Sequence, residues 1–159
     1  LVLSSLNLSD DVFMFIKKKI TGLEPYAIYR IRFYLELASE YPESSVGIGG
    51  SPGAAVTLKI GAASIEPQPV RGDLGYKAWV MNIDKGNQST GGEDMIAIGN
   101  IGIPGDEFVY TRIQRDNSEQ PFYAETGENG ELWVIVGTDS GFEGRTTLYY
   151  DLIRVELSR

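Results

Sequence analysis

Two residue types are missing from this chain of 159 residues, because it contains no cysteine and no histidine. Without cysteine there is no disulfide bond, no thiolate nucleophile, and no thiolate ligand for zinc or an iron–sulfur cluster. Without histidine there is no Ser-His-Asp triad, no imidazole general base and no imidazole metal ligand. Any bound metal is therefore expected to be a hard cation held by oxygen atoms, and calcium is the leading candidate.

Positive charge and long apolar runs are also scarce. The chain carries 14 Lys and Arg against 22 Asp and Glu, so its net charge is -8. It has no basic stripe with interleaved aromatic residues, so we expect neither nucleic acid nor an anionic membrane surface as a partner. No apolar run is long enough to span a bilayer. Because the chain begins at Leu1 rather than Met, we expect an exported protein, periplasmic, cell-surface or secreted, whose signal segment has been removed.

What the chain does contain is strand periodicity interrupted by turn residues. Its 19 Gly and 7 Pro lie in clusters between short apolar runs, and helix signals are rare. The clearest strand covers residues 27–39, where apolar side chains occupy every second position. These features predict an all-β fold, an antiparallel β-sandwich of the jelly-roll type, as one domain over residues 1–159. Further strands are expected at residues 12–20, 55–62, 76–83, 95–98, 107–114, 131–137 and 146–157, the last with a bulge near its middle.

Several segments resemble known jelly-roll proteins. The turn Gly22-Leu-Glu-Pro25, followed by a long strand that ends in Ala-Ser, resembles a recurring phrase of jelly-roll modules. The closing segment 148–157 resembles the last strand of carbohydrate-binding modules in the galactose-binding-domain-like group. In those modules an Asp enters the last strand and often helps to hold a structural calcium, so the resemblance implies that role for Asp151. Segments 9–15, 47–53 and 137–144 also look like signatures of an uncharacterised family of secreted bacterial proteins, a likeness that implies no activity.

The glycine-rich segment 47–53 is a candidate ligand-binding loop. Pro52 stands where the third glycine of a dinucleotide fingerprint belongs, and the Gly-Lys-Ser/Thr ending of a phosphate loop is missing. A purely structural loop is the favoured interpretation. The alternative is that Gly49, Gly50 and Ser51 let the backbone come close to a ligand.

Two stretches rich in oxygen-bearing side chains follow predicted strands. In segment 137–144, no histidine exists to activate a serine, and the favoured interpretation is a turn in which Asp139 caps local backbone N–H groups. The alternative is that Asp139 and Glu143 coordinate calcium or bind a ligand hydroxyl. The stretch 82–94 departs from the EF-hand pattern and is best interpreted as a solvated loop.

Paired carboxylates and tryptophans complete the candidates. Asp10 and Asp11 are neighbours, and in an extended strand they point to opposite faces, so they cannot flank one sugar bond without a bulge. One of them, with Asp11 taken as the candidate, could instead join Asp151 at a calcium site. Trp79 and Trp133 lie on predicted strands; core packing is favoured for both, and the alternative is stacking on a sugar ring.

The leading functional hypothesis is a binding module without catalysis, which recognises carbohydrate or another surface polymer and is steadied by calcium. The first alternative is a carboxylate-type hydrolase. It would use two of the residues Asp84, Glu93, Asp139 and Glu143. The second alternative is a structural or adhesive domain of a cell-surface protein, whose loops meet a protein partner.

Overall fold

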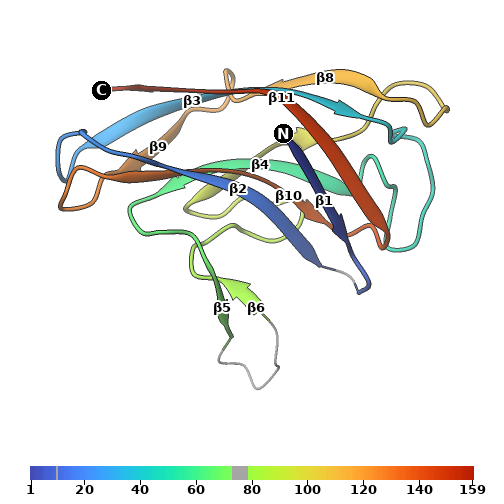
Figure 1. Cartoon of the computed structure of the whole chain (residues 1–159), viewed down its shortest axis with the longest axis horizontal. Coiled ribbons are helices and arrows are strands. Elements are labelled where there is room, and N and C mark those ends of the chain that lie inside the picture. The colour runs from blue at the N-terminus through green and yellow to red at the C-terminus, as the bar shows by residue number, and fades with distance from the viewer. Residues whose placement is uncertain (10, 73–78) are drawn as a thin grey trace.

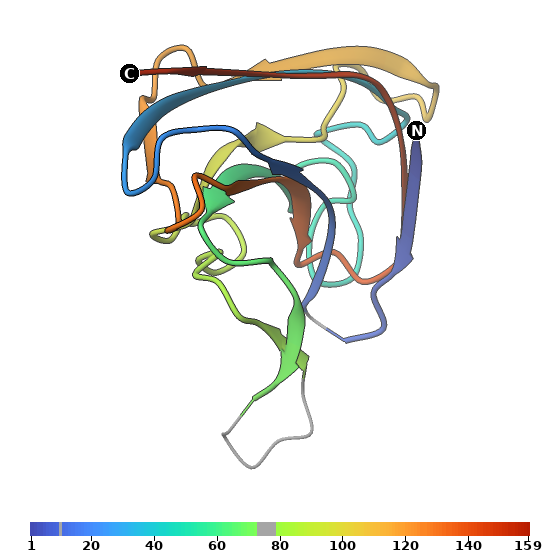
Figure 2. The same cartoon turned by 60° about the vertical axis from the view of Figure 1, so that its left-hand side comes forward.

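The structure is a computed structural model that describes residues 1–9, 11–72 and 79–159. Its described residues form eleven strands, and they contain no helix. Two antiparallel sheets lie face to face, and a small hairpin projects from one of them (Figures 1 and 2). The strands are β1 (Val2–Leu6), β2 (Val12–Ile20), β3 (Ile28–Ser39), β4 (Val56–Ala63), β5 (Pro69–Arg71), β6 (Trp79–Met81), β7 (Met95–Asn100), β8 (Thr111–Asp116), β9 (Phe122–Glu125), β10 (Leu132–Ser140) and β11 (Arg145–Ser158).

Strand order identifies the sandwich as a jelly roll. One sheet has the order β1-β11-β3-β8, with β9 also paired to β3, and the other has the order β2-β10-β4-β7. The chain passes repeatedly from one sheet to the other, so neighbours in a sheet are distant in sequence. The third sheet is the hairpin β5-β6, inserted between β4 and β7. The predicted all-β sandwich of the jelly-roll type is therefore confirmed.

Strand β3 shows how the sequence forms the core between the two sheets. Its residues alternate between buried and more exposed, and the buried side chains that point inward include Tyr29, Ile31, Phe33, Leu35 and Leu37. Alternation of this kind is what a sheet with one face on the core requires. Strand β11 pairs with β3, and the register shifts between Tyr150 and Leu152. The bulge predicted for the last strand is therefore confirmed.

Strands β4 and β10 differ, because they are buried on both faces. All eight residues of β4 and all but one of β10 are buried. One face of each strand packs into the core between the sheets. The opposite face is covered by a second, smaller cluster that includes Ile83, Met95 and Ile135, with Phe13, Phe15 and Met81 packed against it. The segment between β6 and β7 therefore covers the outer face of this sheet.

Several boundaries depart from the predictions. Strands β1, β5 and β9 are short, and the sequence analysis missed them. Strand β8 begins four residues later than expected, and β10 continues to Ser140, so segment 137–140 is strand and not turn. The predicted strand 76–83 lies partly outside the described residues. Within the described residues, no helix is long and apolar enough to cross a membrane.

Candidate functional site

The candidate site is a cleft of about 570 Å³ on the outer face of the β2-β10-β4-β7 sheet. One wall is the start of β2, and the other is the hairpin β5-β6. Figure 2 shows that this hairpin projects from the sandwich. The segment that follows β6 closes the cleft between these walls. It is lined by Asp11, Val12, Phe13, Phe15, Pro69, Trp79, Val80, Met81, Ile83, Asp84, Lys85, Gly86 and Asn87. Apolar side chains and a few polar groups thus converge, as in small-molecule sites.

Trp79 is the most prominent aromatic side chain of the cleft. It is 63% exposed, and it lies opposite Arg71 in the hairpin ladder. The Arg71 guanidinium carbon lies 4.4 Å from the centre of the Trp79 ring, a cation–π contact that supports the orientation of the ring. The interpretation of Trp79 as a core residue is therefore wrong. Trp133 also lies outside the core, half-buried beneath Lys17 and Lys19.

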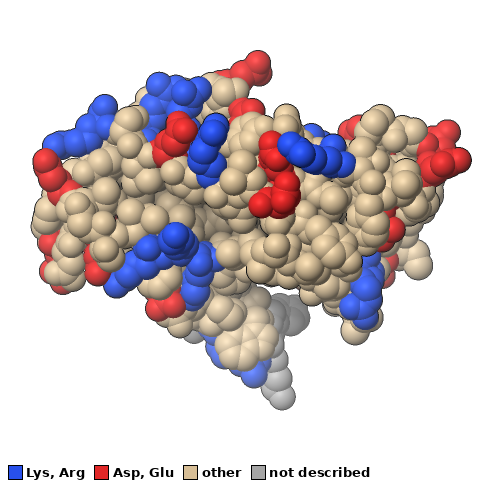
Figure 3. All heavy atoms as spheres, turned by 45° about the horizontal axis from the view of Figure 1, so that its top comes forward, with Lys and Arg blue, Asp and Glu red and all other residues tan. Residues whose placement is uncertain are grey.

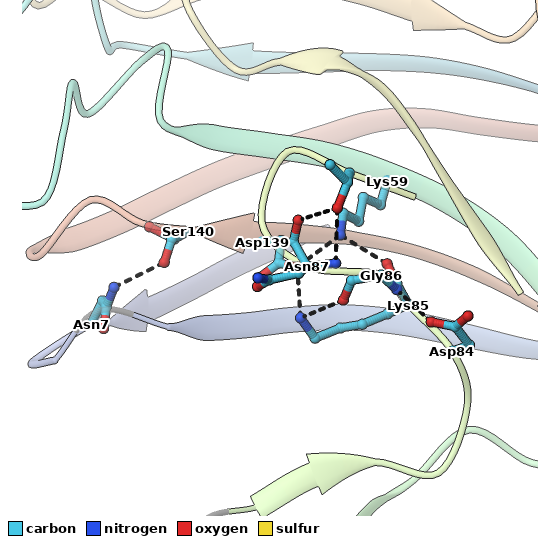
Figure 4. A network of polar contacts seen from close by, with 9 residues as sticks. Asn7, Lys59, Asp84, Lys85, Gly86, Asn87, Asp139 and Ser140 are labelled. Atoms are coloured by element: carbon cyan, nitrogen blue, oxygen red, sulfur yellow. Dashed lines mark hydrogen bonds and ion pairs between the residues drawn. The ribbon is translucent and has the colours of Figure 1, made fainter. Parts of the chain in front are cut away.

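Beneath the cleft, two lysines converge on one buried aspartate (Figure 4). Lys59 on β4 and Lys85 in the segment after β6 each donate a hydrogen bond to Oδ2 of Asp139 on β10, at 2.8 and 2.7 Å. The side chains of Lys59 and Asp139 have no exposed surface, whereas that of Lys85 is 15% exposed. Lys59 also donates to the carbonyl oxygen of Lys85 at 2.8 Å, so it ties the covering segment to the sheet.

Asp11 connects this buried cluster to the cleft. It lines the cleft and is exposed, and its carboxyl group lies within hydrogen-bonding reach of the Asp139 carboxyl. Partial burial and the neighbouring Asp139 raise the pKa of Asp11 above its ordinary value. The second oxygen of Asp139, Oδ1, is buried and has no hydrogen-bond donor among the described residues. When Asp11 is protonated, its carboxyl group can donate a hydrogen bond.

The segment after β6 is held in shape by its own carboxylates. Asp84 accepts hydrogen bonds from the backbone N–H groups of Gly86 and Glu93, at 3.0 and 2.9 Å. These bonds hold the pKa of Asp84 below its ordinary value. Asp94 in turn accepts from the backbone N–H of Asp84 at 2.7 Å. The oxygen-rich stretch 82–94 is therefore an internally bonded cover over the sheet.

The glycine-rich loop lies elsewhere, where it packs against the segment before β11. Gly49 has a φ of +74°, and a Cβ there would lie 2.2 Å from the carbonyl oxygen of Gly141. The N–H of Glu143 donates to the carbonyl oxygen of Ile48 at 2.8 Å. Ser51 accepts from the N–H groups of Gly53 and Ala54. These contacts occupy Gly49 and Ser51 within the fold, and with Gly50 and Glu143 they are absent from the residues that line the cleft.

The two candidate calcium ligands lie in different sheets. Asp11 precedes β2, whereas Asp151 lies in β11, where it is exposed and lines a separate pocket with Arg112 and Tyr149. Asp10 falls outside the described residues. Within the described ranges, no group of three or more acidic side chains could hold a metal ion. The residues described around Asp11 and Asp151 thus do not fit a shared calcium site, and calcium at other groups stays a prediction.

Of the residues predicted from the sequence, the structure brings Trp79, Asp139 and Asp11 to one place. The sequence analysis missed the two lysines, the paired rings of Phe13 and Phe15, and Arg71. Phe13 and Phe15 stack with their ring centres 5.4 Å apart. One signal for Lys59 was available: it is the single charged residue in the otherwise uncharged run 54–63. A charge in such a run must be paired if both strand faces are covered.

Comparisons with known proteins add little to this picture. No protein-family model matches the sequence, and no curated protein matches it. A crystal structure of "a putative sugar binding protein" from Bacteroides thetaiotaomicron aligns with 91% of this chain and 67% of its own, at 10% identity and a TM-score of 0.39. Similarity at this level carries no argument about a ligand. Membership of the galactose-binding-domain-like group therefore stays a prediction.

Proposed function

We propose that this domain binds carbohydrate in the cleft between β2 and the β5-β6 hairpin, and that it does so without catalysis. The observation that carries the proposal is the exposed indole of Trp79 within a cleft that also holds Asp11, Asp84, Lys85 and Asn87. Sugars present apolar C–H faces and a rim of hydroxyl groups. A flat aromatic ring beside hydrogen-bonding side chains is complementary to both features.

Charge distribution favours a neutral carbohydrate. Basic and acidic side chains are interspersed over the face of the molecule shown in Figure 3, and the whole chain has a net charge of -8. A negative field slows the approach of polyanions such as acidic polysaccharides, and it has little effect on neutral ones. In the cleft, Lys85 is already paired with Asp139 and is not a free cation for a ligand anion.

The burial of Asp139 supports binding rather than hydrolysis. Glycoside hydrolysis needs two carboxyl groups that reach the sugar from opposite sides. Asp139 has no exposed surface, so no substrate can contact it in this conformation. Of the other carboxylates considered for hydrolysis, Glu93 and Glu143 are absent from the residues that line the cleft. Asp84 lines the cleft, but its two carboxylate oxygens accept hydrogen bonds from backbone N–H groups.

Affinity electrophoresis of the whole chain in gels that contain neutral or acidic polysaccharides tests the proposal. At least one neutral polysaccharide is expected to retard the wild type. Trp79→Ala is expected to weaken binding about tenfold, through the loss of roughly 1.4 kcal/mol of stacking and contact energy. Tyr123→Ala is the matched control, because Tyr123 is 56% exposed on β9 in the other sheet. No retardation by any polysaccharide, or equal retardation of Trp79→Ala and wild type, contradicts the proposal.

A further inference from the structure

The buried contact between Lys59 and Asp139 holds an amine nitrogen and a carboxyl group against each other. The two residues lie on adjacent strands, since Lys59 pairs with Gly137 and Asp139 pairs with Thr57 across the β4-β10 ladder. Both side chains are fully buried, and Nζ lies 2.8 Å from Oδ2. Amines and carboxyl groups held in contact within a fold gain an effective molarity of about 10⁵ to 10⁸ M for reaction with one another.

The surroundings of this pair are apolar and exclude water. The sheet face above it carries the stacked rings of Phe13 and Phe15. Two opposite charges in such a site have lost most of their hydration, which favours conversion of the pair to a product that carries no charge. Lys85 is partly exposed, whereas Lys59 is fully buried against Asp139. Lys59 is therefore the nucleophile of the two lysines.

Asp11 completes the arrangement as the group that moves protons. Asp11 lines the cleft, and its carboxyl group is close enough to that of Asp139 to have its pKa raised by it. A carboxylic acid at this position polarises the Asp139 carbonyl, accepts a proton from the attacking nitrogen and donates one to the departing oxygen.

We propose that Lys59 and Asp139 condense to form an intramolecular amide bond between β4 and β10. The neutral Nζ of Lys59 attacks Cγ of Asp139, a C–N bond forms, and one C–O bond of the carboxyl group breaks. The amine and the carboxylic acid become an amide and one water molecule, so atoms and electrons balance without an oxidant, a reductant or a cofactor. The remaining oxygen accepts from Lys85, and the buried oxygen that lacks a donor is removed.

An amide at this position joins residues that are 80 positions apart. The chain contains no cysteine, so no disulfide can provide this kind of cross-link. Any condition that unfolds the sandwich would leave β4 and β10 attached. The cross-link is independent of whether the cleft binds carbohydrate.

Intact mass spectrometry of the purified whole chain under denaturing conditions tests the proposal directly. The wild type is expected to be lighter than its sequence by one water molecule, and a proteolytic digest should contain a branched peptide that joins Lys59 to Asp139. Lys59→Met should show the full mass of its sequence. Lys18→Met, which removes an exposed lysine from β2, should keep the loss of water. The wild-type measurement decides the outcome even if Lys59→Met fails to fold.

Three results would overturn the proposal: a wild-type mass equal to that of the sequence, a loss of water that persists in Lys59→Met, or a branch through Lys85. A persistent loss without a branch indicates a cyclic imide at an aspartate instead. In a time course after refolding, Asp11→Asn should form the amide about 100-fold more slowly than wild type, as expected when a general acid–base group is removed. Equal rates would remove Asp11 from the reaction.

Discussion

The two faces of β4 and β10 are both buried, but different chemistry lies on each side. The inner face carries Val56, Leu58 and Ile60 into a core of apolar side chains between the sheets. The outer face carries Lys59 and Asp139 beneath a cover made by the segment after β6. The inner face requires only apolar side chains that fill the available volume. The outer face also requires each buried charged group to contact a group of opposite charge. The outer face is therefore the more sensitive to single substitutions that leave a charge alone.

Removal of Asp139, the carboxyl group that Lys59 and Lys85 share, is expected to have the largest effect on stability. Asp139→Ala leaves Lys59 and Lys85 beneath the cover without the buried carboxyl group to which both donate. We expect the free energy of unfolding to fall by about 3 to 5 kcal/mol, as measured by urea denaturation. Asp151→Ala removes an exposed aspartate from β11 and should change it by less than about 0.5 kcal/mol. A loss below about 1 kcal/mol for Asp139→Ala would show that the cover tolerates unpaired charge.

Contact between cover and sheet can be disturbed without any change of charge. Gly61 lies under the cover, and a Cβ there would lie 2.0 Å from the carbonyl oxygen of Asp94. Gly61→Ala is expected to cost about 1 to 3 kcal/mol, because the backbone of the cover must move away from the sheet. In Gly127→Ala the new Cβ would lie 3.6 Å from its nearest neighbour, an ordinary contact, so that variant is the control. If Gly61→Ala and Gly127→Ala unfolded at equal urea concentrations, the cover would lie farther from the sheet than the structure shows.

Protonation of Asp11 is expected to have the smallest effect on the free energy of unfolding. Its pKa is raised in the folded state, so its contribution to stability is fully present below its ordinary value of 3.8 and is lost as pH rises through the raised pKa. Because Asp11 is exposed, the change should be roughly 0.5 kcal/mol. Urea denaturation from acidic to neutral pH should show the wild type losing stability relative to Asp11→Asn. If the free energy of unfolding changed with pH in the same way in both proteins, the pKa of Asp11 would not be raised in the folded state.

The inner face was predictable from sequence, because it depends on a periodicity that any single strand displays. Alternation along 27–39 identified β3 and the residues it buries, and the long closing strand showed its bulge. The short strands β5 and β9 have three and four residues, too few to display a period. Segment 137–140 has the composition of a turn, and pairing with β2 and β4 keeps it extended.

The outer face was only partly predictable, because its contacts depend on register between distant strands. Asp139 was identified as a candidate, but its partner Lys59 lies 80 positions away, and no local pattern joins them. Trp79 was assigned to the core by the general behaviour of aromatic residues, whereas a projecting hairpin places it in solvent. A hairpin that projects from the sandwich does not pack on the core, so its sequence has no apolar face from which its orientation could be predicted.

The two sheets of the sandwich maintain the fold, whereas the sequence of the β5-β6 hairpin is free to change. Strands β5 and β6 pair only with each other, and Asn82 fastens their base through bonds to Gln68 and the carbonyl oxygen of Glu66. Replacements along the hairpin that leave this base intact would alter one wall of the cleft and none of the ladder contacts of the two sheets. The ligand preference of the proposed site could therefore change at low cost to folding, as it does in binding loops carried by rigid scaffolds.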